Sequence, residues 1–418
     1  MNFKDLLLES FDTVLNESVP QNCMLPFIPK PSKGKTYVIG AGKAAAKMAQ
    51  VFENNYKGDF EGMVITRYGF MCHTKKLEVV EASHPNPDEQ GRIATKRILD
   101  IARNAKEGDR VICLLSGGGS ALMSCPHEEI YFQEYQDLND QLLKCGASIH
   151  EINCLRKHLN RAFGGKLAKA AFPAKMITLS ISDVAGDDPS TIASGPTVGD
   201  PTTLKQAKAV IDKYEIEAGK TILKFLDNPE NETPKPEDGI FKKSEYRLIA
   251  TPEKSLQAAA QFFKRNEITP YILSSELEGD TNECASIHAS IVKRVIENDE
   301  PFKKPCVIIS GGETTVKVTG SGDGGPNTQF MLKLAMDLGE GHNVHALACD
   351  TDGIDGCMDN AGAIISSNTI KRAEEEGVSP KKFLANNDSY KFFKKLDDLI
   401  ITGPTHTNVN DYRAIIIK

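Results

Sequence analysis

The chain has 418 residues, more than one ordinary hydrophobic core organises, so two domains are expected. Its 40% hydrophobic and 26% charged residues are typical of a globular protein that folds in water, and no run approaches the roughly 20 apolar residues of a membrane span. The net charge of −7 argues against a nucleic-acid or membrane-surface partner, and ten scattered cysteines without a CxxC pair favour reduced thiols in the cytoplasm.

Short apolar runs alternate with helical patterns through the first half of the chain. The stretch 3–15 has helical apolar spacing interrupted by acidic residues, which argues against a signal peptide. Unbroken apolar runs indicate strands whose two faces are both covered by helices, and the alternation predicts βαβ units around a parallel, Rossmann-like sheet. Strands are expected at 35–40, 61–66, 77–82, 110–116 and 174–182, and helices after Gly42, Asp88, Gly119 and Gly165.

The second half begins after a break in composition. The stretch 227–239 is charged and proline-rich, so we interpret it as a linker or a long surface loop. The sequence predicts two three-layer α/β/α domains, 1–238 and 239–418, with largely parallel sheets and a cleft between them; the N-terminal helix can pack on either. Further strands are expected at 246–250, 268–274, 305–312, 314–320, 343–350, 399–403 and 412–418.

Unusual residues follow the first expected strand, at the end where ligands bind in this fold class. In VIGAGKAAAKM, Gly40 and Gly42 precede Lys43 at a helix start, which is typical of an anion site. GxGxxA is also the dinucleotide fingerprint, but Arg67 stands where the ribose-binding acid should follow the second strand. A lysine here suits a transferring phosphoryl group better. The structural alternative is a close turn with a solvated lysine.

Three glycines between two serines interrupt the apolar run LLSGGGSALM. Glycines allow another group to approach the backbone, and amides and hydroxyls here can bind a phosphate or a carboxylate. This is not a Walker loop, because GxxxxGK[ST] is absent. A merely tight turn is the alternative. The candidate binding residues are Ser116, Gly117, Gly118, Gly119 and Ser120.

The segment 180–203 follows a strand and is dense in Asp, Ser, Thr and Gly. Carboxylates just past a strand can hold Mg²⁺ or take a proton from a hydroxyl. We expect Asp183 to orient or deprotonate an attacking hydroxyl. The alternative is a surface loop with capping aspartates. Further candidate binding residues here are Asp187, Gly195 and Thr197.

Loops of similar composition recur in the second half, in IISGGETTV, GSGDGGPNTQF, ACDTDGIDG and TGPTHTNVND. The third lacks the glutamate that would close an EF-hand calcium loop. The histidines have no metal-ligand spacing, and we interpret HPNPD at His84 as a turn fixed by two prolines. The candidate binding residues are Gly311, Gly312, Glu313, Thr314, Asn327, Asp352, Asp355, Thr405 and Asn408.

Taken together, these motifs resemble the class II glycerate kinases, which combine an N-terminal domain of their own type with a C-terminal MOFRL domain. The resemblance runs from about residue 35 to 415, in order and without a missing block. It rests on VIGAGKAA, LLSGGGSAL, INCLRKHLN with GGKLA, SDVAGDDPSTIASGPT, SGGETTVKVTG, DTDGIDG and GPTHTNVND. It implies phosphorylation of D-glycerate by ATP, with Mg²⁺, to give 2-phosphoglycerate. Some members carry the label hydroxypyruvate reductase, so an NAD(P)-dependent reductase is the alternative activity.

The resemblance also carries individual residues onto this chain. The family's active-site lysine matches Lys43, and its serine-glycine loop matches 116–120. Acidic motif positions, each a possible metal ligand, match Asp183, Glu313 and Asp352. A basic cluster on a helix matches Arg156, Lys157 and His158, of which the first two are candidate binding residues.

Two departures from the family motifs bear on activity. Where the family often writes GGRNQEF with an active-site arginine, this chain has Pro326, which supplies neither charge nor N–H. Asp350 stands where the family usually has glycine. A catalytically impaired ligand-binding relative therefore stays open as a third reading. The expected partner is a small hydroxy acid rather than a nucleic acid or a membrane, and a homodimer is a possible assembly.

Overall fold

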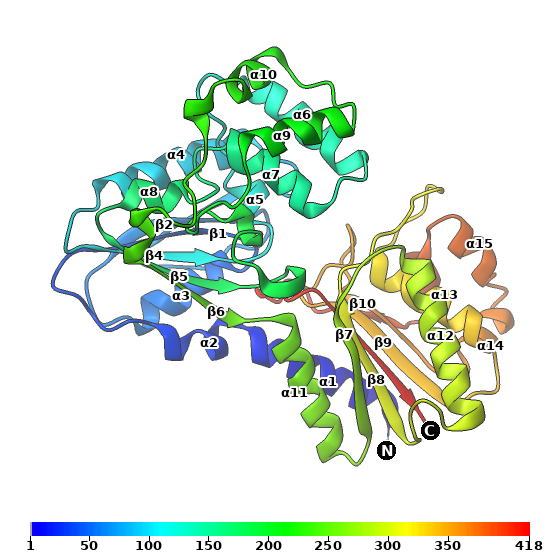
Figure 1. Ribbon diagram of the computed structural model, residues 1–418. Helices are drawn as coiled ribbons and strands as arrows, with labels where there is room; N and C mark the ends of the chain where they lie inside the picture. The colour runs from blue at the N-terminus through cyan, green and yellow to red at the C-terminus, as the bar shows by residue number, and fades with distance from the viewer. Residues whose placement is uncertain (1) are drawn as a thin grey trace. The chain divides into compact units, whose positions relative to one another are not determined.

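The computed structural model describes residues 2–418, which divide into two compact units (Figure 1). The first unit comprises Pro20–Asp183 and Asp187–Ile249, and the second comprises residues 2–19, Val184–Gly186 and Ala250–Lys418. Within residues 2–418, no helix is both long and apolar enough to cross a bilayer. No disulfide bond joins any of the ten cysteines, all of which lie within the described residues.

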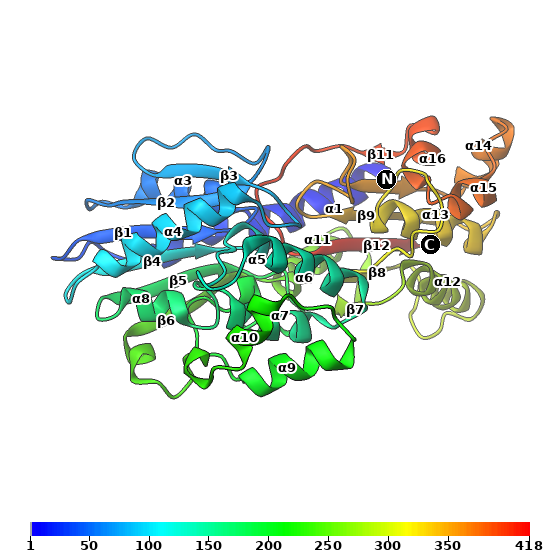
Figure 2. The same ribbon diagram turned by 90° about the horizontal axis from the view of Figure 1, so that it is seen from above.

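The first unit is built on a six-stranded sheet in the order β3-β2-β1-β4-β5-β6 (Figure 2). The registered pairs β1–β2, β1–β4, β2–β3 and β4–β5 are parallel, which confirms the expected Rossmann-like sheet. In this strand order the winding reverses between β1 and β4, and the crevice at their carboxyl ends is where such folds bind ligands. The strands are β1 (Thr36–Ala41), β2 (Glu61–Arg67), β3 (Glu78–Ala82), β4 (Arg110–Leu115), β5 (Lys175–Ile181) and β6 (Ser244–Ala250).

Helices cover both faces of this sheet, with α2 and α3 on one face and α4, α5 and α8 on the other (Figure 1). The helices α6, α7, α9 and α10 pack around a core of their own, and of these the sequence analysis expected only α7, as the helix that carries the basic cluster. The bounds are α2 (Pro20–Cys23), α3 (Ala45–Asn55), α4 (Glu89–Asn104), α5 (Gly119–Leu122), α6 (Phe132–Lys144), α7 (Ile149–Leu159), α8 (Lys166–Ala171), α9 (Leu204–Lys213) and α10 (Lys220–Leu226). Short 3₁₀ turns are η1 (Leu25–Phe27), η2 (Ala185–Asp187), η3 (Ile192–Ser194), η4 (Pro229–Asn231) and η5 (Gly239–Lys243).

The stretch 227–239 is a loop of the first unit and does not join the two units. It contains η4, and its Thr233 is buried. Because β6 pairs with β5, the first unit continues to Ile249, beyond the expected boundary at 238/239. The composition of residues 227–239 correctly indicated a loop, but only the pairing of β6 with β5 decides that the segment after this loop belongs to the first unit.

The second unit has a mixed sheet in the order β11-β10-β9-β12-β8-β7 (Figure 2). Only β7–β8 is parallel, and the other registered pairs are antiparallel, so the expectation of a largely parallel sheet was wrong for this unit. An apolar run indicates a strand covered on both faces but does not encode its direction. The strands are β7 (Thr269–Leu277), β8 (Cys306–Gly312), β9 (Val344–Asp350), β10 (Gly362–Ile365), β11 (Leu399–Ile400) and β12 (Asp411–Ile417).

The segment 314–320, expected as a strand, is a loop. Its only ladder contact within the described chain is an isolated bridge between Thr315 and Asp280. Val318 is 72% exposed, and the amides of Thr319 and Gly320 donate to the side chain of Asn387. The alternating pattern was present, but no apolar surface lies against it, so the segment does not join the sheet.

Helices also cover both faces of the second sheet (Figure 1). The N-terminal helix α1 packs beside α11 on this unit, where the Tyr412 hydroxyl donates a hydrogen bond to Ser10 Oγ at 2.9 Å. Helices α12 to α16 cover the opposite face. The bounds are α1 (Phe3–Ser18), α11 (Pro252–Arg265), α12 (Thr281–Asn298), α13 (Pro326–Leu338), α14 (Thr369–Glu375), α15 (Pro380–Ala385) and α16 (Ser389–Lys395).

Candidate active site

Two loops interlock at the carboxyl ends of β1 and β4. The Lys43 amide donates to the Gly117 carbonyl at 2.9 Å, and the Ala44 amide donates to Ser116 Oγ at 3.0 Å. A Cβ built at Gly42, whose φ is 145°, would lie 2.1 Å from Ser116 Oγ. Part of the reason for the glycines is therefore that one loop lies directly against the other.

This interlock engages the amides at the start of α3. The Gly42 amide donates to the Ile65 carbonyl at 3.1 Å, and the Ala45 amide donates to the Gly42 carbonyl at 3.0 Å. With Lys43 and Ala44 already bonded to the neighbouring loop, these four amides all have protein acceptors. Gly40 is needed for strand contact, because its Cβ would lie 2.0 Å from the Leu114 carbonyl oxygen. The amides from Gly42 to Ala45 are thus occupied, so the groups of this turn that could still meet an anion are the Lys43 side chain and the next amides of α3.

The second loop leaves its amides open. Throughout residues 2–418, the amides of Gly117 and Gly118 find no hydrogen-bond acceptor. Gly118 has a left-handed φ of 80°. A Cβ placed there would lie 2.9 Å from His84 Cδ2 and 3.4 Å from Lys43 Cγ. The groups that come closest to this backbone are therefore two polar side chains, from the loops after β3 and β1.

Positive charge gathers around His84. Burial, and then the charges of Lys43, Arg67 and Arg156, lower the pKa of His84 to about 3, so its imidazole is neutral at physiological pH. Neither ring nitrogen has a hydrogen-bond partner in the part of the chain that the structure describes. We call Lys43, Arg67, Arg156 and His84 the cation cluster. Three cations beside two open amides can bind an anion that carries more than one charge.

Arg156 is a buried member of this cluster. The residue lies on α7 and only 8% of it is exposed. Its Nε donates to Asn139 Oδ1 at 2.8 Å. Burial lowers the pKa of the guanidinium, and no carboxylate of residues 2–418 lies within ion-pair distance of it. A buried guanidinium without a counter-charge favours binding of an anion from solution.

The C-terminal turn of α7, which carries Arg156, is held by a lysine of the GGKLA motif. Lys166 Nζ donates to the carbonyls of Lys157, His158 and Asn160 at 2.8, 2.8 and 2.7 Å. An ammonium at a helix C-terminus satisfies carbonyls that have no partner within the helix and complements the negative end of the dipole. Lys166 therefore fixes the turn from which Arg156 extends.

Lys157 and His158 face a different environment from Arg156. Lys157 Nζ pairs with Asp200 Oδ1 at 3.3 Å, and both side chains are buried. His158 Nε2 lies 2.9 Å from Glu232 Oε1, in the loop 227–239. The basic cluster expected to bind a ligand thus divides, with one residue in the cation cluster and two in a buried network that ties this loop to α7.

The segment after β5 packs against the glycine loop. Ser120 Oγ lies 2.8 Å from Ser194 Oγ, which donates to Asn153 Oδ1 at 2.9 Å. Ala193 and Ser194 have left-handed φ values of 49° and 59°, and a Cβ at Gly119 would lie 2.7 Å from Ala193 Cβ. This contact therefore holds both residues; Gly119 is buried and Ser120 is half-buried.

Other predicted residues of this segment have varied surroundings. Thr197 is buried and accepts a hydrogen bond from Thr178 Oγ1 at 2.8 Å, while Gly195 ends η3 with a φ of 59°. Asp183 and Asp187 are half-buried, with Asp183 two residues beyond β5, at the same sheet edge as the glycine loop. Asp188, which the sequence analysis did not select, accepts hydrogen bonds from Ser190 and Thr191, which outweigh burial and lower its pKa.

In the second unit, predicted residues gather where β8 and β9 end and β12 begins. Gly311 and Gly312 close β8, Thr314 is buried and Glu313 is exposed. Asn327 Nδ2 donates to Asp411 Oδ1 at 2.6 Å, and the guanidinium of the fully buried Arg413 pairs with Asp411. Arg413 was missed by the sequence analysis, because a lone arginine in an apolar strand carries no motif.

Asp352 and Asp355 have internal partners. The Asp355 carboxylate accepts the amides of Asn327 and Thr328 at 2.8 Å each and so caps α13, and burial raises its pKa to about 6. Asp352 Oδ1 accepts the Ile354 amide at 2.8 Å, and its carbonyl accepts the Thr405 amide at 3.2 Å.

Pro326 and Asn408 complete the predicted set in this unit. Asn408 is buried and accepts the Asn410 amide at 3.3 Å. Pro326 is the first residue of α13, a position where the missing N–H costs no helical hydrogen bond. The proline that replaces the family arginine is therefore well suited to its place in the helix.

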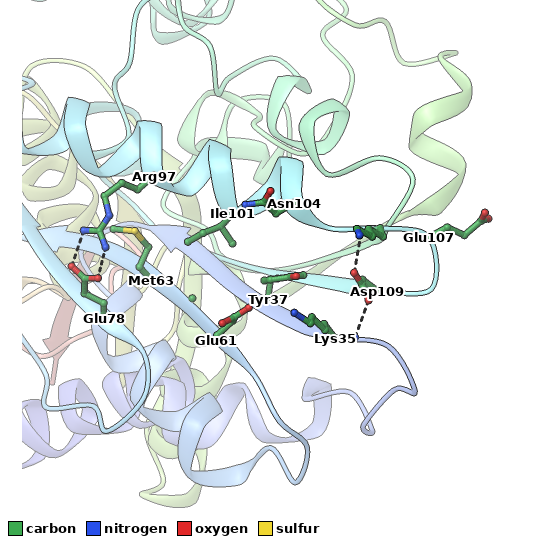
Figure 3. A pocket seen from close by; sticks show the side chains of 12 residues that line it. Lys35, Tyr37, Glu61, Met63, Glu78, Arg97, Ile101, Asn104, Glu107 and Asp109 are labelled. Atoms are coloured by element: carbon green, nitrogen blue, oxygen red, sulfur yellow. Dashed lines mark hydrogen bonds and ion pairs between the residues drawn. The ribbon is translucent and has the colours of Figure 1, made fainter.

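A hollow of about 650 Å³ lies at the amino ends of β1, β2 and β4, the sheet edge opposite the cation cluster (Figure 3). Two of its charged side chains pair, since Arg97 binds Glu78, and Asp109 accepts the Lys35 amide at 2.9 Å (Figure 3). Because ligands of this fold class bind at the carboxyl ends of the strands, we place the candidate site there instead.

His84 and Arg67 are the residues of this site that the sequence analysis misjudged. His84 was interpreted as part of a structural turn, and Arg67 was not among the candidate binding residues. Both stand at the carboxyl ends of parallel strands, Arg67 as the last residue of β2 and His84 two residues beyond β3. That position is the signal that could have selected them.

The chain matches two known protein families, one in each half of its sequence. Residues 6–227 match the family described as a domain of unknown function (DUF4147), and residues 306–411 match the MOFRL family. The chain is 42% identical over 417 residues to a "Putative hydroxypyruvate reductase" of Agrobacterium vitis, covering 99% of this chain and 94% of that protein. It is 40% identical over 393 residues to the "Glycerate 2-kinase" of Pyrococcus horikoshii, covering 92% and 88%. A crystal structure of glycerate kinase from Thermotoga maritima matches with a TM-score of 0.88 and 37% identity, covering 100% of this chain and 99% of that one.

Proposed function

We propose a kinase function from the premise that the chain belongs to the glycerate kinase family in which a DUF4147 domain precedes a MOFRL domain. The proposed reaction transfers the γ-phosphoryl group of ATP to the 2-hydroxyl of D-glycerate and gives 2-phosphoglycerate. The observation that supports it best is the cation cluster beside the open amides of the glycine loop. Phosphoryl transfer depends mainly on positioning and on neutralising charge, which such a cluster supplies.

Within this proposal each group of the first unit has a task. The amides of Gly117 and Gly118 donate to phosphate or carboxylate oxygens. Arg156, held by α7, orients an anionic group through a fixed planar fork, while the more flexible Lys43, a single point charge, follows the transferring phosphoryl group. The acceptor carboxylate of glycerate adds a further negative charge that the three cations balance.

A magnesium ion would enter with the nucleotide. Among residues 2–418 no group of three or more His, Cys, Asp or Glu side chains could hold a metal ion. This fits Mg²⁺ bound to ATP, which needs only one or two protein carboxylates beside the phosphates and its waters. Asp183 would hold it in the first unit, and Asp352 and Glu313 are the candidates in the second. The ion would supply charge neutralisation at the phosphates.

A hydroxypyruvate reductase is the second candidate, because the Agrobacterium vitis relative carries that name and the chain has GxGxxA. The geometry argues against it. The amides from Gly42 to Ala45, in the turn where a dinucleotide pyrophosphate would bind, have protein acceptors, and Arg67 stands in place of the acid that binds the ribose. A 2′-phosphate of NADP could pair with such an arginine, so the assay includes both cofactors.

One pair of assays tests the proposal. Purified protein with ATP, Mg²⁺ and D-glycerate should release ADP only when the hydroxy acid is present, and phosphorus NMR should show the phosphate on carbon 2. The same protein with hydroxypyruvate should oxidise neither NADH nor NADPH. Reduction of hydroxypyruvate faster than any ADP release would contradict the kinase proposal.

A further inference from the structure

His84 combines three properties that no other member of the cation cluster has together. It lies against Gly118, since a Cβ on that glycine would come within 3.1 Å of His84 Nε2. Its ring nitrogens have no protein partner within residues 2–418. It is neutral, whereas Lys43, Arg67 and Arg156 carry positive charge.

A hydroxyl that attacks phosphorus must lose its proton. Lysine ammonium and arginine guanidinium groups only donate hydrogen bonds, so Lys43, Arg67 and Arg156 can bind the phosphates but cannot take this proton. A neutral imidazole has one nitrogen with a free lone pair. At the place where anions are drawn to the glycine loop, His84 is thus the member of the cluster that can act as a base.

We propose that His84 is a catalytic residue whose imidazole takes the hydroxyl proton of the hydroxy acid during phosphoryl transfer; this rests on the kinase function proposed above. The O–H bond breaks and its proton moves to the free ring nitrogen. The hydroxyl oxygen uses its electron pair to form the new O–P bond, and the bond between the γ-phosphorus and the bridging oxygen breaks, leaving its electron pair on ADP. The imidazolium later returns the proton to water.

The surrounding charges make this step depend on the bound substrates. In the free protein, burial and the three cations hold the pKa of His84 near 3, so that it carries no proton. The phosphates and the substrate carboxylate place negative charge among Lys43, Arg67 and Arg156 and offset them, which raises the pKa of His84. The imidazole therefore becomes a better proton acceptor once both substrates are bound.

Asp183 is the competing base. It lies at the same sheet edge, two residues beyond β5, and a carboxylate can also accept this proton. The two assignments differ in what they predict for substitutions. Because Asp183 is also proposed to hold Mg²⁺, a loss of kcat in Asp183→Asn does not by itself identify the base. If His84 is the base, His84→Gln lowers kcat; if Asp183 is the base, His84→Gln keeps the wild-type kcat.

The test compares His84→Gln and His84→Ala with His150→Gln, which changes an exposed histidine at the start of α7. We expect His84→Gln to lower kcat by about 10²–10⁴. The KM values for ATP and D-glycerate should stay within about threefold, because the three cations that bind the anions remain. His150→Gln should keep wild-type kinetics, and thermal melts of all variants should agree if they fold alike.

Chemical rescue separates a proton acceptor from a structural role. Imidazole added to His84→Ala should restore a measurable part of kcat, saturably, while it leaves the wild type unchanged. The acidic limb of the wild-type kcat–pH profile should vanish in His84→Gln. An undiminished kcat in His84→Gln, or a loss in His84→Ala that imidazole does not rescue, would overturn the base assignment while the kinase function stands. A wild-type protein that does not phosphorylate glycerate would overturn both.

Discussion

Gly118→Ala tests the glycine loop, and Gly108→Ala is its matched control. Both glycines have left-handed φ values, 80° at Gly118 and 90° at Gly108. The surroundings differ. A Cβ at Gly108 meets nothing within 4 Å, whereas a Cβ at Gly118 lies 2.9 Å from His84 Cδ2. The two variants therefore share the backbone strain, and only Gly118→Ala disturbs the cation cluster.

The expected magnitudes follow from these contacts. An alanine in the left-handed region costs about 1–2 kcal/mol, so both variants should lose this much stability. At Gly118 the added methyl must also displace the His84 ring, and such overpacking adds up to about 1–3 kcal/mol, less if the ring rotates freely. Displacement of a reacting group by about 1 Å can cost roughly 10² in rate. We therefore expect kcat/KM of Gly118→Ala to fall at least that far.

The assay is steady-state ADP release with D-glycerate, beside thermal melts of both variants and the wild type. Gly108→Ala should melt a few degrees lower, since 1 kcal/mol corresponds to about 2–4 °C in a domain of this size, and should keep its kcat/KM. Gly118→Ala should melt at least as low and lose activity. Equal activity in the two variants would refute the reasoning and leave the glycine loop as a turn without a role at the site.

Three further outcomes are expected. Lys43→Ala should lower kcat by about 10²–10⁴, because it removes a positive charge from the site, and a thermal melt beside the kinetics checks that the variant folds; an unchanged kcat would remove Lys43 from the mechanism. Lys166→Met should destabilise the first unit by at least about 2 kcal/mol, because the carbonyls at the end of α7 lose their donor, and should also lower kcat/KM through Arg156. The exposed Lys169→Met on α8 is its control, and equal urea unfolding midpoints for the two would contradict the assigned role. For Glu232, burial acts to raise the pKa, but hydrogen bonds from Lys235, the Leu204 amide and His158 outweigh it and lower the pKa from 4.5 to about 2. The ionised Glu232 therefore stabilises the fold above pH 4.5, and this contribution is lost as the pH falls toward 2. Over this interval the melting temperature of Glu232→Gln should fall less than that of the wild type. Parallel curves of melting temperature against pH for the two proteins would refute the assignment.

Much of the first unit follows from sequence alone. Strand and helix periods are local properties, and so is a glycine pair between a strand and a helix. They predicted the parallel sheet, the helices α3, α4, α5 and α8, and the placing of Lys43 and the glycine loop at the carboxyl ends of strands. The direction of β12 in the second sheet could not be predicted from local sequence, because an apolar run has the same pattern in a parallel and in an antiparallel strand.

The composition of the candidate site was decided by tertiary structure. Arg156, Lys157 and His158 are consecutive, but successive helical residues point about 100° apart, so they face different surroundings once α7 is packed. The amides after Gly42 looked open in the sequence and are closed by a loop more than seventy residues away. His84 belongs to the site because β3 is parallel to β2, which in turn pairs with β1, so that the carboxyl ends of all three strands lie at one edge of the sheet. A sequence specifies which groups each strand end presents; which of them meet, and which are already satisfied, depends on the packing of elements that are distant along the chain.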